Sequence, residues 1–263
     1  MAVKRRPAGQ GDAGMGQDFT GRTALVTGAA TGFGRRIAEL LATAGARGVA
    51  FDRVAHKPPT GFVVVTGDVA LEADLARGVA AAVERFGGLD LVVANAGIVP
   101  PWRETEALDL DEWDRVFAVN VKGVAATLKH AVPALRAAGG GAIVAMASMN
   151  AARAHPRQCA YTASKHAVLG IVRATALDLG RHGIRVNAVA PGPVATAALV
   201  ERMTSRAAAG GLAVEEALRR HAGETALGRM VTEDDVARTV LHLLGPQSAG
   251  MTGQMLTVDA GLA

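Results

Sequence analysis

The chain has 263 residues, of which 50% are apolar but only 3% aromatic, and its 28 basic and 24 acidic side chains give a net charge of +4. This length suits one α/β domain with a large aliphatic core. The charge excess is small, partly confined to residues 4–6, and accompanied by few aromatic rings, which argues against a nucleic-acid-binding surface. The single Cys159 excludes an intrachain disulfide and a multi-cysteine metal site, and we expect it to be buried.

Residues 1–18 lack the apolar core of a secretory signal and are rich in glycine and polar residues. We therefore predict a disordered N-terminal extension. No run of residues reaches the length of a transmembrane helix, and one cysteine fits a reducing compartment, so we expect a cytoplasmic protein without membrane partners. From residue 19 to residue 263, short apolar runs alternate with helical patterns. The alternation predicts a single domain built on a parallel sheet with helices on both faces.

The first apolar run, residues 23–27, leads into the glycine-rich turn Gly28-x-x-x-Gly32-x-Gly34 and then into a helical pattern. A strand, a glycine turn and a helix form the first unit of a nucleotide-binding α/β fold. The glycines let the backbone approach a pyrophosphate, and the helix N-terminus offers free N–H groups. The same glycines would suit an ordinary tight turn, so this motif alone is weak evidence.

Asp52 ends a second predicted strand, residues 48–51, about 20 residues beyond the glycine turn. A carboxylate there can accept from a ribose 2′-hydroxyl and would repel a 2′-phosphate, which favours NAD over NADP. Arg53 could offset that repulsion, and a strand-end turn is the structural alternative. Too few residues separate Asp52 from the next strand, residues 62–66, for a full helix.

The middle of the chain carries an unusual amide. A helix is predicted over residues 71–86, a strand over 89–94, and a long helix from residue 111 to residue 135. Asn120 lies inside that helix, where an amide costs helix propensity and, if buried, needs partners. It marks either a polar surface position or a functional kink.

The only tyrosine in the chain, Tyr161, opens a long apolar helix that runs to about residue 181, and Lys165 follows one turn later on the same face. A cation beside a phenol stabilises the phenolate, so we expect the pKa of Tyr161 to lie below its usual value of about 10. Such a tyrosine can act as a general acid or base, although a surface tyrosine beside a solvated lysine is the alternative. Ser148 ends the preceding strand, residues 142–147, where open α/β sheets bind ligands.

The last third of the chain contains an insertion between regular elements. A strand is predicted over residues 184–190, a helix over 232–244 and a final strand over 255–258. Between them, residues 195–225 are rich in alanine and contain two short helical patterns. We predict that this segment forms a lid over the substrate. Because it offers few polar side chains to bind a substrate, we expect a substrate of modest size that is partly apolar.

Taken in order, these motifs make the chain resemble a short-chain dehydrogenase/reductase of the single-domain type, over roughly residues 19–263. The resemblance implies a Rossmann-like, doubly wound, parallel seven-stranded sheet and an NAD(P)-dependent oxidoreductase acting on CH–OH groups. It implies four catalytic residues: Asn120, Ser148, Tyr161 and Lys165. It also implies a cofactor-binding set: Gly28, Thr31, Phe33, Gly34, Asp52, Arg53, Asp68, Val69, Asn95, Ala96, Gly97, Tyr161, Lys165, Pro191, Gly192, Val194 and Thr196.

The roles that the resemblance implies are distinct. Tyr161 would be the general acid or base, Lys165 would also bind the nicotinamide ribose, and Ser148 would bind the substrate oxygen. Asn120 would hold a water that connects Lys165 to solvent. Asp68 would contact the adenine, and Thr196 the carboxamide. The chain departs from the family pattern in three ways: Phe33 replaces a small aliphatic residue, Ala94 replaces an asparagine, and the helix after Asp52 is missing.

The sequence thus predicts hydride transfer between NAD(H) and a secondary alcohol or its ketone, with no metal. Two alternatives stay open. The first is an NADPH-dependent 3-oxoacyl reductase, which Asp52 and Thr31 disfavour. The second is a non-catalytic dinucleotide-binding protein, since fold does not fix function. The resemblance also implies a homotetramer or homodimer.

Overall fold

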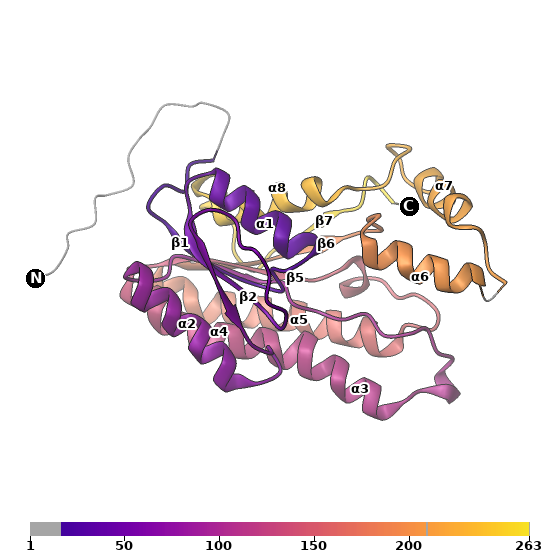
Figure 1. The fold of residues 1–263 in the computed structure, drawn as a ribbon, viewed down its shortest axis with the longest axis horizontal. Helices are drawn as coiled ribbons and strands as arrows, with labels where there is room; N and C mark the ends of the chain where they lie inside the picture. Colours follow the sequence, from indigo (N-terminus) through magenta and orange to yellow (C-terminus); the bar gives the residue numbers. More distant parts are fainter. Residues whose placement is uncertain (1–16, 209, 263) are drawn as a thin grey trace, which may run out of the picture.

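The computed structural model describes residues 17–208 and 210–262. Its centre is a seven-stranded parallel sheet in the order β3-β2-β1-β4-β5-β6-β7, which confirms the predicted doubly wound, Rossmann-like fold (Figure 1). The strands are β1 (Thr23–Thr27), β2 (Arg47–Asp52), β3 (Phe62–Thr66), β4 (Leu91–Ala94), β5 (Gly141–Met146), β6 (Ile184–Pro191) and β7 (Met255–Val258). The order reverses direction between β1 and β4, and ligands of such sheets bind outside the carboxyl ends of the strands at that point.

Two helical layers cover the sheet, one on each face. One layer consists of α1 (Gly32–Thr43) and α8 (Glu233–Leu244), and the other of α2 (Glu72–Phe86), α4 (Gly123–Ala137) and α5 (Cys159–Leu179) (Figure 1). Each layer encloses its own apolar core, which alternate residues of the strands supply: Leu25 faces the core under α2, α4 and α5, whereas Val26 faces the core under α1 and α8. Because both faces are covered, all five residues of β1 are buried, as expected of a parallel strand.

The long helix predicted from residue 111 is interrupted at Asn120. The chain forms α3 (Leu110–Phe117), then a π-helical turn (Ala118–Lys122), then α4. Asn120 is fully buried within that turn, so the surface interpretation is wrong and the kink is confirmed. Single π turns occur often at functional sites, because they shift the direction of the side chains that follow.

Two short helices lie at the carboxyl end of the sheet, in the segment predicted as a lid. They are α6 (Ala197–Ala208) and α7 (Val214–Gly223), seen beyond the ends of β5 and β6 in Figure 1. No helix joins β2 to β3, as the short connection predicts. None of the helices in the described ranges is long and apolar enough to cross a membrane.

Residues 1–16 of the predicted extension lie outside the described residues. Phe19, the first residue of the predicted domain, is buried in the core beside α1. One prediction about a single residue is wrong. Cys159 is exposed, so the expectation of a buried thiol is wrong. It is the first residue of α5, and the buried face of that helix begins one position later at Ala160.

Candidate active site

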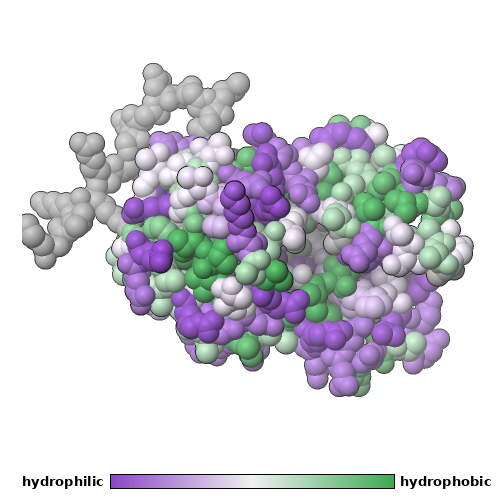
Figure 2. Space-filling view, viewed as in Figure 1, coloured by the Kyte–Doolittle hydropathy of each residue, from purple (hydrophilic) through white to green (hydrophobic). Residues whose placement is uncertain are grey.

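A cavity of about 770 Å³ opens at the carboxyl ends of the strands and extends to α6 and α7, a volume suited to a cofactor and a small substrate. The same hollow is visible beside these two helices in the space-filling view (Figure 2). All the predicted catalytic and cofactor-binding residues line this cavity except Gly34 and Asn120. Residues scattered over 170 positions of sequence therefore meet at one site, because parallel strands bring their carboxyl ends to one edge.

The N-terminus of α1 offers unpaired donors to this cavity. Thr31 occupies the N-cap position without a side-chain hydrogen bond, and the first turn carries no acidic residue. By contrast, a complete capping box closes the start of α8, where Thr232 and Asp235 exchange hydrogen bonds. The first N–H groups of a helix and its partial positive charge bind phosphate groups. This end of the cavity therefore fits the pyrophosphate of a dinucleotide.

The glycine turn is shaped by close packing against the end of β4. A Cβ at Gly34 would stand 2.0 Å from the carbonyl oxygen of Gly28, so only glycine allows the helix to begin so close to the turn. The Asn95 amide donates to the carbonyl oxygens of Thr27 and Gly28, at 2.9 and 3.0 Å. Gly34 is not among the residues that line the cavity, and its close approach to Gly28 supports the shape of the turn.

Asp52 is held against the glycine turn. Its carboxylate accepts from the backbone N–H of Ala30 at 2.9 Å and from that of Val54 at 3.1 Å. The two arginines of α1 are not directed to a cofactor, because Arg35 pairs with Glu39, and Arg36 pairs with Glu39 and Asp234. An acidic group therefore faces the cavity at the end of β2, with Arg53 beside it as the nearest lining cation.

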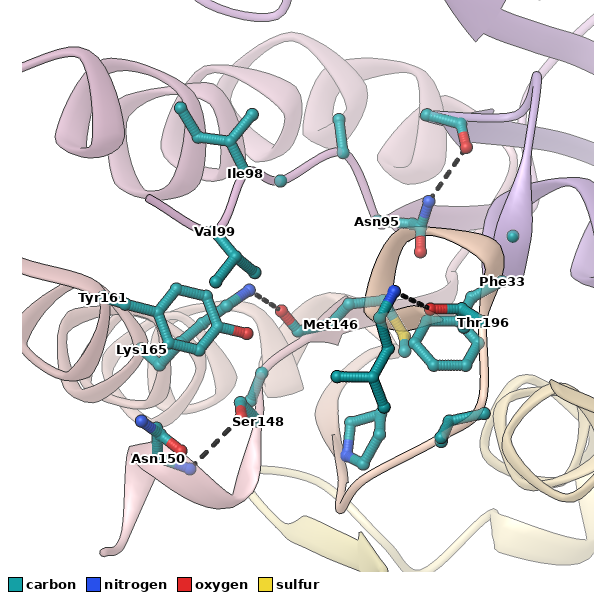
Figure 3. A pocket seen from close by; sticks show the side chains of 18 of the residues that line it. Phe33, Asn95, Ile98, Val99, Met146, Ser148, Asn150, Tyr161, Lys165 and Thr196 are labelled. Atoms are coloured by element: carbon teal, nitrogen blue, oxygen red, sulfur yellow. Dashed lines mark hydrogen bonds between the residues drawn. The ribbon is translucent and has the colours of Figure 1, made fainter. Parts of the chain in front are cut away.

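Ser148, Tyr161 and Lys165 face one another across the other half of the cavity (Figure 3). Ser148 and Lys165 are only 8% and 5% exposed, and Tyr161 is half-buried. The Lys165 ammonium donates to the carbonyl oxygen of Met146 at 2.8 Å and lies 5.7 Å from the centre of the Tyr161 ring. A phenol, a hydroxyl and an ammonium group thus converge where a substrate oxygen could be placed.

The expected lowering of the pKa of Tyr161 is wrong for the protein alone. Burial of the ring raises the pKa of Tyr161 above its usual 10, and the opposing influences are a hydrogen bond with Ser148 and the charge of Arg202. The spacing Tyr161-x-x-x-Lys165 places the ammonium against the face of the ring and the Met146 carbonyl, so the predicted cation does not act at the phenol oxygen. Arg202, from the lid helix α6, supplies the cationic influence instead.

Burial also acts on Lys165, where it lowers the pKa of the ammonium from 10.5 to about 8. We expect Lys165→Met to raise the free energy of unfolding near pH 7 by at most about 3 kcal/mol, because a buried charge is removed. Between pH 8 and 10.5 the unfolded chain binds more protons at this lysine than the folded protein does, so wild-type stability rises with pH relative to the variant.

Urea unfolding at pH 7 and pH 10 measures both effects. Lys57→Met, which removes an exposed lysine in the loop before β3, serves as the control and should change neither stability nor its pH dependence. A Lys165→Met protein that is less stable than the wild type at pH 7 would show that the bond to Met146 outweighs the cost of burying the charge.

Asn120 supports the site from behind the cavity wall. Its side chain accepts from the N–H of Ile98 at 2.8 Å, donates to the carbonyl oxygen of Ile98 at 2.9 Å, and donates to the Ser164 hydroxyl at 3.2 Å. These bonds fasten the segment after β4 to the helix that carries Tyr161. A Cβ at Gly97 would lie 3.3 Å from the Asn120 amide oxygen and 3.6 Å from the Lys165 ammonium, so a side chain at this position would crowd both groups.

The remaining predicted cofactor residues follow β3 and β6. Asp68 accepts from the N–H of Ala70 and lines the cavity beside Val69. Pro191, Gly192 and Val194 line it beyond β6. The Thr196 hydroxyl accepts from the N–H of Leu199 at 3.2 Å, which caps the first turn of α6.

Several lining residues were missed by the sequence reasoning. Arg202 and Arg206 enter the cavity from α6, so the lid does carry polar anchors and the expectation of few is wrong. A signal was present, because Leu199, Arg202 and Arg206 have the spacing i, i+3, i+7 and share one helical face. His155 and Trp102, from the loops that follow Ser148 and Asn95-Ala96-Gly97, line the cavity too, and a place in the cavity wall is what the sequence suggested for Trp102.

Comparisons with known proteins identify the family of the chain. A family model described as enoyl-(acyl carrier protein) reductase matches residues 28–263. The chain is 34% identical over 255 residues to an uncharacterized oxidoreductase of Thermotoga maritima, covering 93% of this chain and 98% of the relative. The crystal structure of levodione reductase is similar with a TM-score of 0.87 and 30% identity, over 92% of this chain and 97% of that chain. Carveol dehydrogenase from Mycobacterium avium, solved in complex with NAD, gives a TM-score of 0.85 and 32% identity, over 93% and 98%.

The chain is an oxidoreductase that uses a nicotinamide dinucleotide and acts on CH–OH groups or the corresponding carbonyls. It belongs to the short-chain dehydrogenase/reductase family.

Proposed function

We propose that the protein transfers a hydride between NAD(H) and a secondary alcohol or its ketone, with Tyr161 as the general acid or base. The observation that carries this proposal is the meeting, in one cavity, of the Tyr161 phenol with Ser148, Lys165 and the uncapped N-terminus of α1. A phosphate-binding helix end and a proton-transfer group are the two parts that such a reaction needs.

When bound, NAD supplies the hydride acceptor. Oxidation of the alcohol then requires the protein to remove one proton, and Tyr161 takes it from the substrate hydroxyl. The Ser148 hydroxyl donates a hydrogen bond to the same oxygen, where negative charge develops. In the reverse direction Tyr161 gives the proton to the carbonyl oxygen. Lys165 would bind the nicotinamide ribose, and it places a positive charge next to the tyrosine ring.

Three features support NAD over NADP. The Asp52 carboxylate faces the cavity at the end of β2, where it would accept from a ribose hydroxyl and repel a 2′-phosphate. Arg35 and Arg36 are engaged with Glu39 and Asp234. Carveol dehydrogenase, similar over nearly the whole chain, was solved with NAD.

Other aspects of the function stay predictions from the sequence. They are assembly into a homotetramer or homodimer, a cytoplasmic location, and closure of residues 195–225 over the substrate. The lid prediction is supported by the lining residues that α6 contributes to the cavity.

The near-ultraviolet absorbance of NADH tests the proposed function. The protein is mixed with NAD or NADP and a panel of secondary alcohols, cyclic diols, polyols and 3-hydroxyacyl thioesters, and the reverse reaction includes an enoyl thioester. We expect NADH to form with at least one alcohol, and NADPH to form much more slowly. Turnover confined to NADPH and an oxoacyl or enoyl thioester would contradict the proposal and favour an acyl-thioester reductase.

A further inference from the structure

Three arginines from two segments gather at the end of the cavity beneath the lid. Arg202 and Arg206 lie one turn apart on α6, and Arg157 belongs to the loop before α5. The guanidinium carbon of Arg206 lies 3.5 Å from the centre of the Trp102 ring, and that of Arg157 lies 5.4 Å from it. Trp102 therefore acts as a platform that holds two cations by contact with its ring.

Each segment that carries these arginines has a contact that helps to position it. Met203, between Arg202 and Arg206, is 3% exposed, so α6 has a buried side. Arg157 has a φ of 64°, which is rare for a residue other than glycine, and its carbonyl oxygen accepts from the N–H of Arg103 at 3.0 Å. A residue kept in this conformation by its surroundings costs about 1–3 kcal/mol and is often found at ligand sites.

The cluster has more positive charge than its neighbours neutralise. Arg157 pairs with Glu104 at 3.7 Å, whereas neither Arg202 nor Arg206 forms a salt bridge within residues 17–208 and 210–262. Both are half-buried, and burial lowers their pKa. The pKa of Arg206 is lowered further by the charges of Arg202 and Arg157. Half-buried cations that repel one another are stabilised when an anion binds between them.

The position of the cluster shows which molecule could supply the anion. Arg202 is close enough to Tyr161 for its charge to lower the pKa of the phenol, and both residues line the cavity. The other anion-binding feature, the start of α1 beside Asp52, lies at the carboxyl ends of β1 and β2. The arginines therefore belong to the half of the cavity where a substrate is turned over, and the cofactor phosphates have a separate place.

We propose that the substrate carries an oxyanion, a carboxylate or a phosphate, which Arg202 and Arg206 bind beside the reacting carbon. The proposal rests on the function proposed above and narrows its substrate class to hydroxy acids or phosphorylated alcohols, with their oxo forms. A guanidinium group presents a planar fork of donors that matches both kinds of oxyanion. The contact with the Trp102 ring holds the guanidinium group of Arg206 in place before the substrate binds.

Matched substrates test the proposal through kcat/KM with NAD. The pairs are 3-hydroxy and cyclic hydroxy carboxylic acids with their methyl esters, and phosphate monoesters of diols with the free diols. We expect at least one acid or phosphate to exceed its neutral partner by tenfold or more. Arg202→Met and Arg206→Met should each lower kcat/KM for the anion by about 10- to 100-fold, since a charge-assisted hydrogen bond is lost.

Two sets of variants separate binding from folding. Arg219→Met removes an exposed arginine of α7 that does not line the cavity, and should change kcat/KM by less than about twofold. Arg202→Lys and Arg206→Lys keep the charge and should recover part of the loss for the anion. Equal losses for the acid and its ester in the methionine variants would overturn the proposal in favour of a purely structural contact with Trp102.

Binding without turnover distinguishes this proposal from the proposed function. The dissociation constants of the oxo acids and phosphates are measured calorimetrically on the protein saturated with NADH. If an anion binds tenfold or more weakly to Arg202→Met than to the wild type, the anion site is supported. If the wild type then shows no hydride transfer with any substrate, only the proposed reaction is contradicted. If no anion in the panel binds more tightly than its neutral partner, the anion site is wrong.

Discussion

Tyr161→Phe is expected to reduce kcat by about 10³-fold or more while changing the dissociation constant of NADH less than about threefold, because general acid–base catalysis contributes about 10²- to 10⁴-fold. Phenylalanine fills nearly the same volume, so the half-buried ring position keeps its packing and the cavity keeps its shape. Only the oxygen that exchanges the substrate proton, and its hydrogen bond with Ser148, are removed. Quenching of protein fluorescence by NADH measures affinity, and initial rates measure kcat.

A control variant must show that the loss of turnover comes from the missing proton-transfer group and not from misfolding. Ser148→Ala removes the hydroxyl beside Tyr161 but leaves the phenol, so it should reduce kcat less than Tyr161→Phe does. Loss of both turnover and NADH binding in Tyr161→Phe would indicate misfolding, and turnover close to that of the wild type would exclude Tyr161 as the proton-transfer group.

The pH dependence of the reaction follows from the same residue. Burial raises the pKa of Tyr161, so in the protein alone the phenol titrates at a higher pH than an ordinary tyrosine. Oxidation needs the deprotonated form and should accelerate as pH rises, whereas reduction needs the protonated form and should slow. Because Tyr161 is the only tyrosine in the chain, tyrosinate absorbance reports its titration directly. A midpoint below pH 10 in the protein alone would contradict the effect of burial.

The second large effect is expected at Asp52. Asp52→Asn should reduce the preference for NAD over NADP by about 100-fold, since placing like charges together costs several kcal/mol and each 1.4 kcal/mol is a factor of ten. The asparagine oxygen can still accept from the N–H of Ala30, so the glycine turn keeps that contact. The ratio of kcat/KM for the two cofactors is the measurement.

Asp68→Asn is the matched control, because Asp68 is a second carboxylate that lines the cavity and accepts a backbone hydrogen bond. Its loss should weaken NAD and NADP to similar extents. If Asp52→Asn leaves the preference unchanged, or if the wild type prefers NADP, then the carboxylate at the end of β2 does not select the cofactor.

The meeting of the glycine turn with Asp52 and Asn95 could be predicted from the sequence, because strand ends and glycine turns fix it. Once strands and helices alternate, Gly28, Asp52 and Asn95 must meet at the carboxyl edge of the sheet. The kink at Asn120 was foreseen as one of two alternatives, since an amide in an apolar helix is consistent with both a surface position and a buried turn.

The part of the cavity around Tyr161 and α6 could not be predicted in the same way, because it depends on packing between distant segments. Arg202 lines the cavity next to Met203, which is buried, and the ring of Trp102 reaches Arg206 from a loop about a hundred residues earlier. Local spacing gave the neighbours of Tyr161 along α5 but not the burial of its ring or the charge of Arg202. Burial, the hydrogen bond with Ser148 and the charge of Arg202 together set the pKa of Tyr161, and all three come from the tertiary structure.

The most direct test of hydride transfer uses NADH deuterated at both positions of nicotinamide C4. It is mixed with the ketone that reacts fastest in the panel, and mass spectrometry of the alcohol product follows the label. We expect one deuterium on the carbinol carbon with the wild type, and no labelled alcohol above background with Tyr161→Phe. Alcohol formed without deuterium, or NADH oxidised without alcohol, would contradict hydride transfer between the nicotinamide and a carbonyl carbon in this cavity.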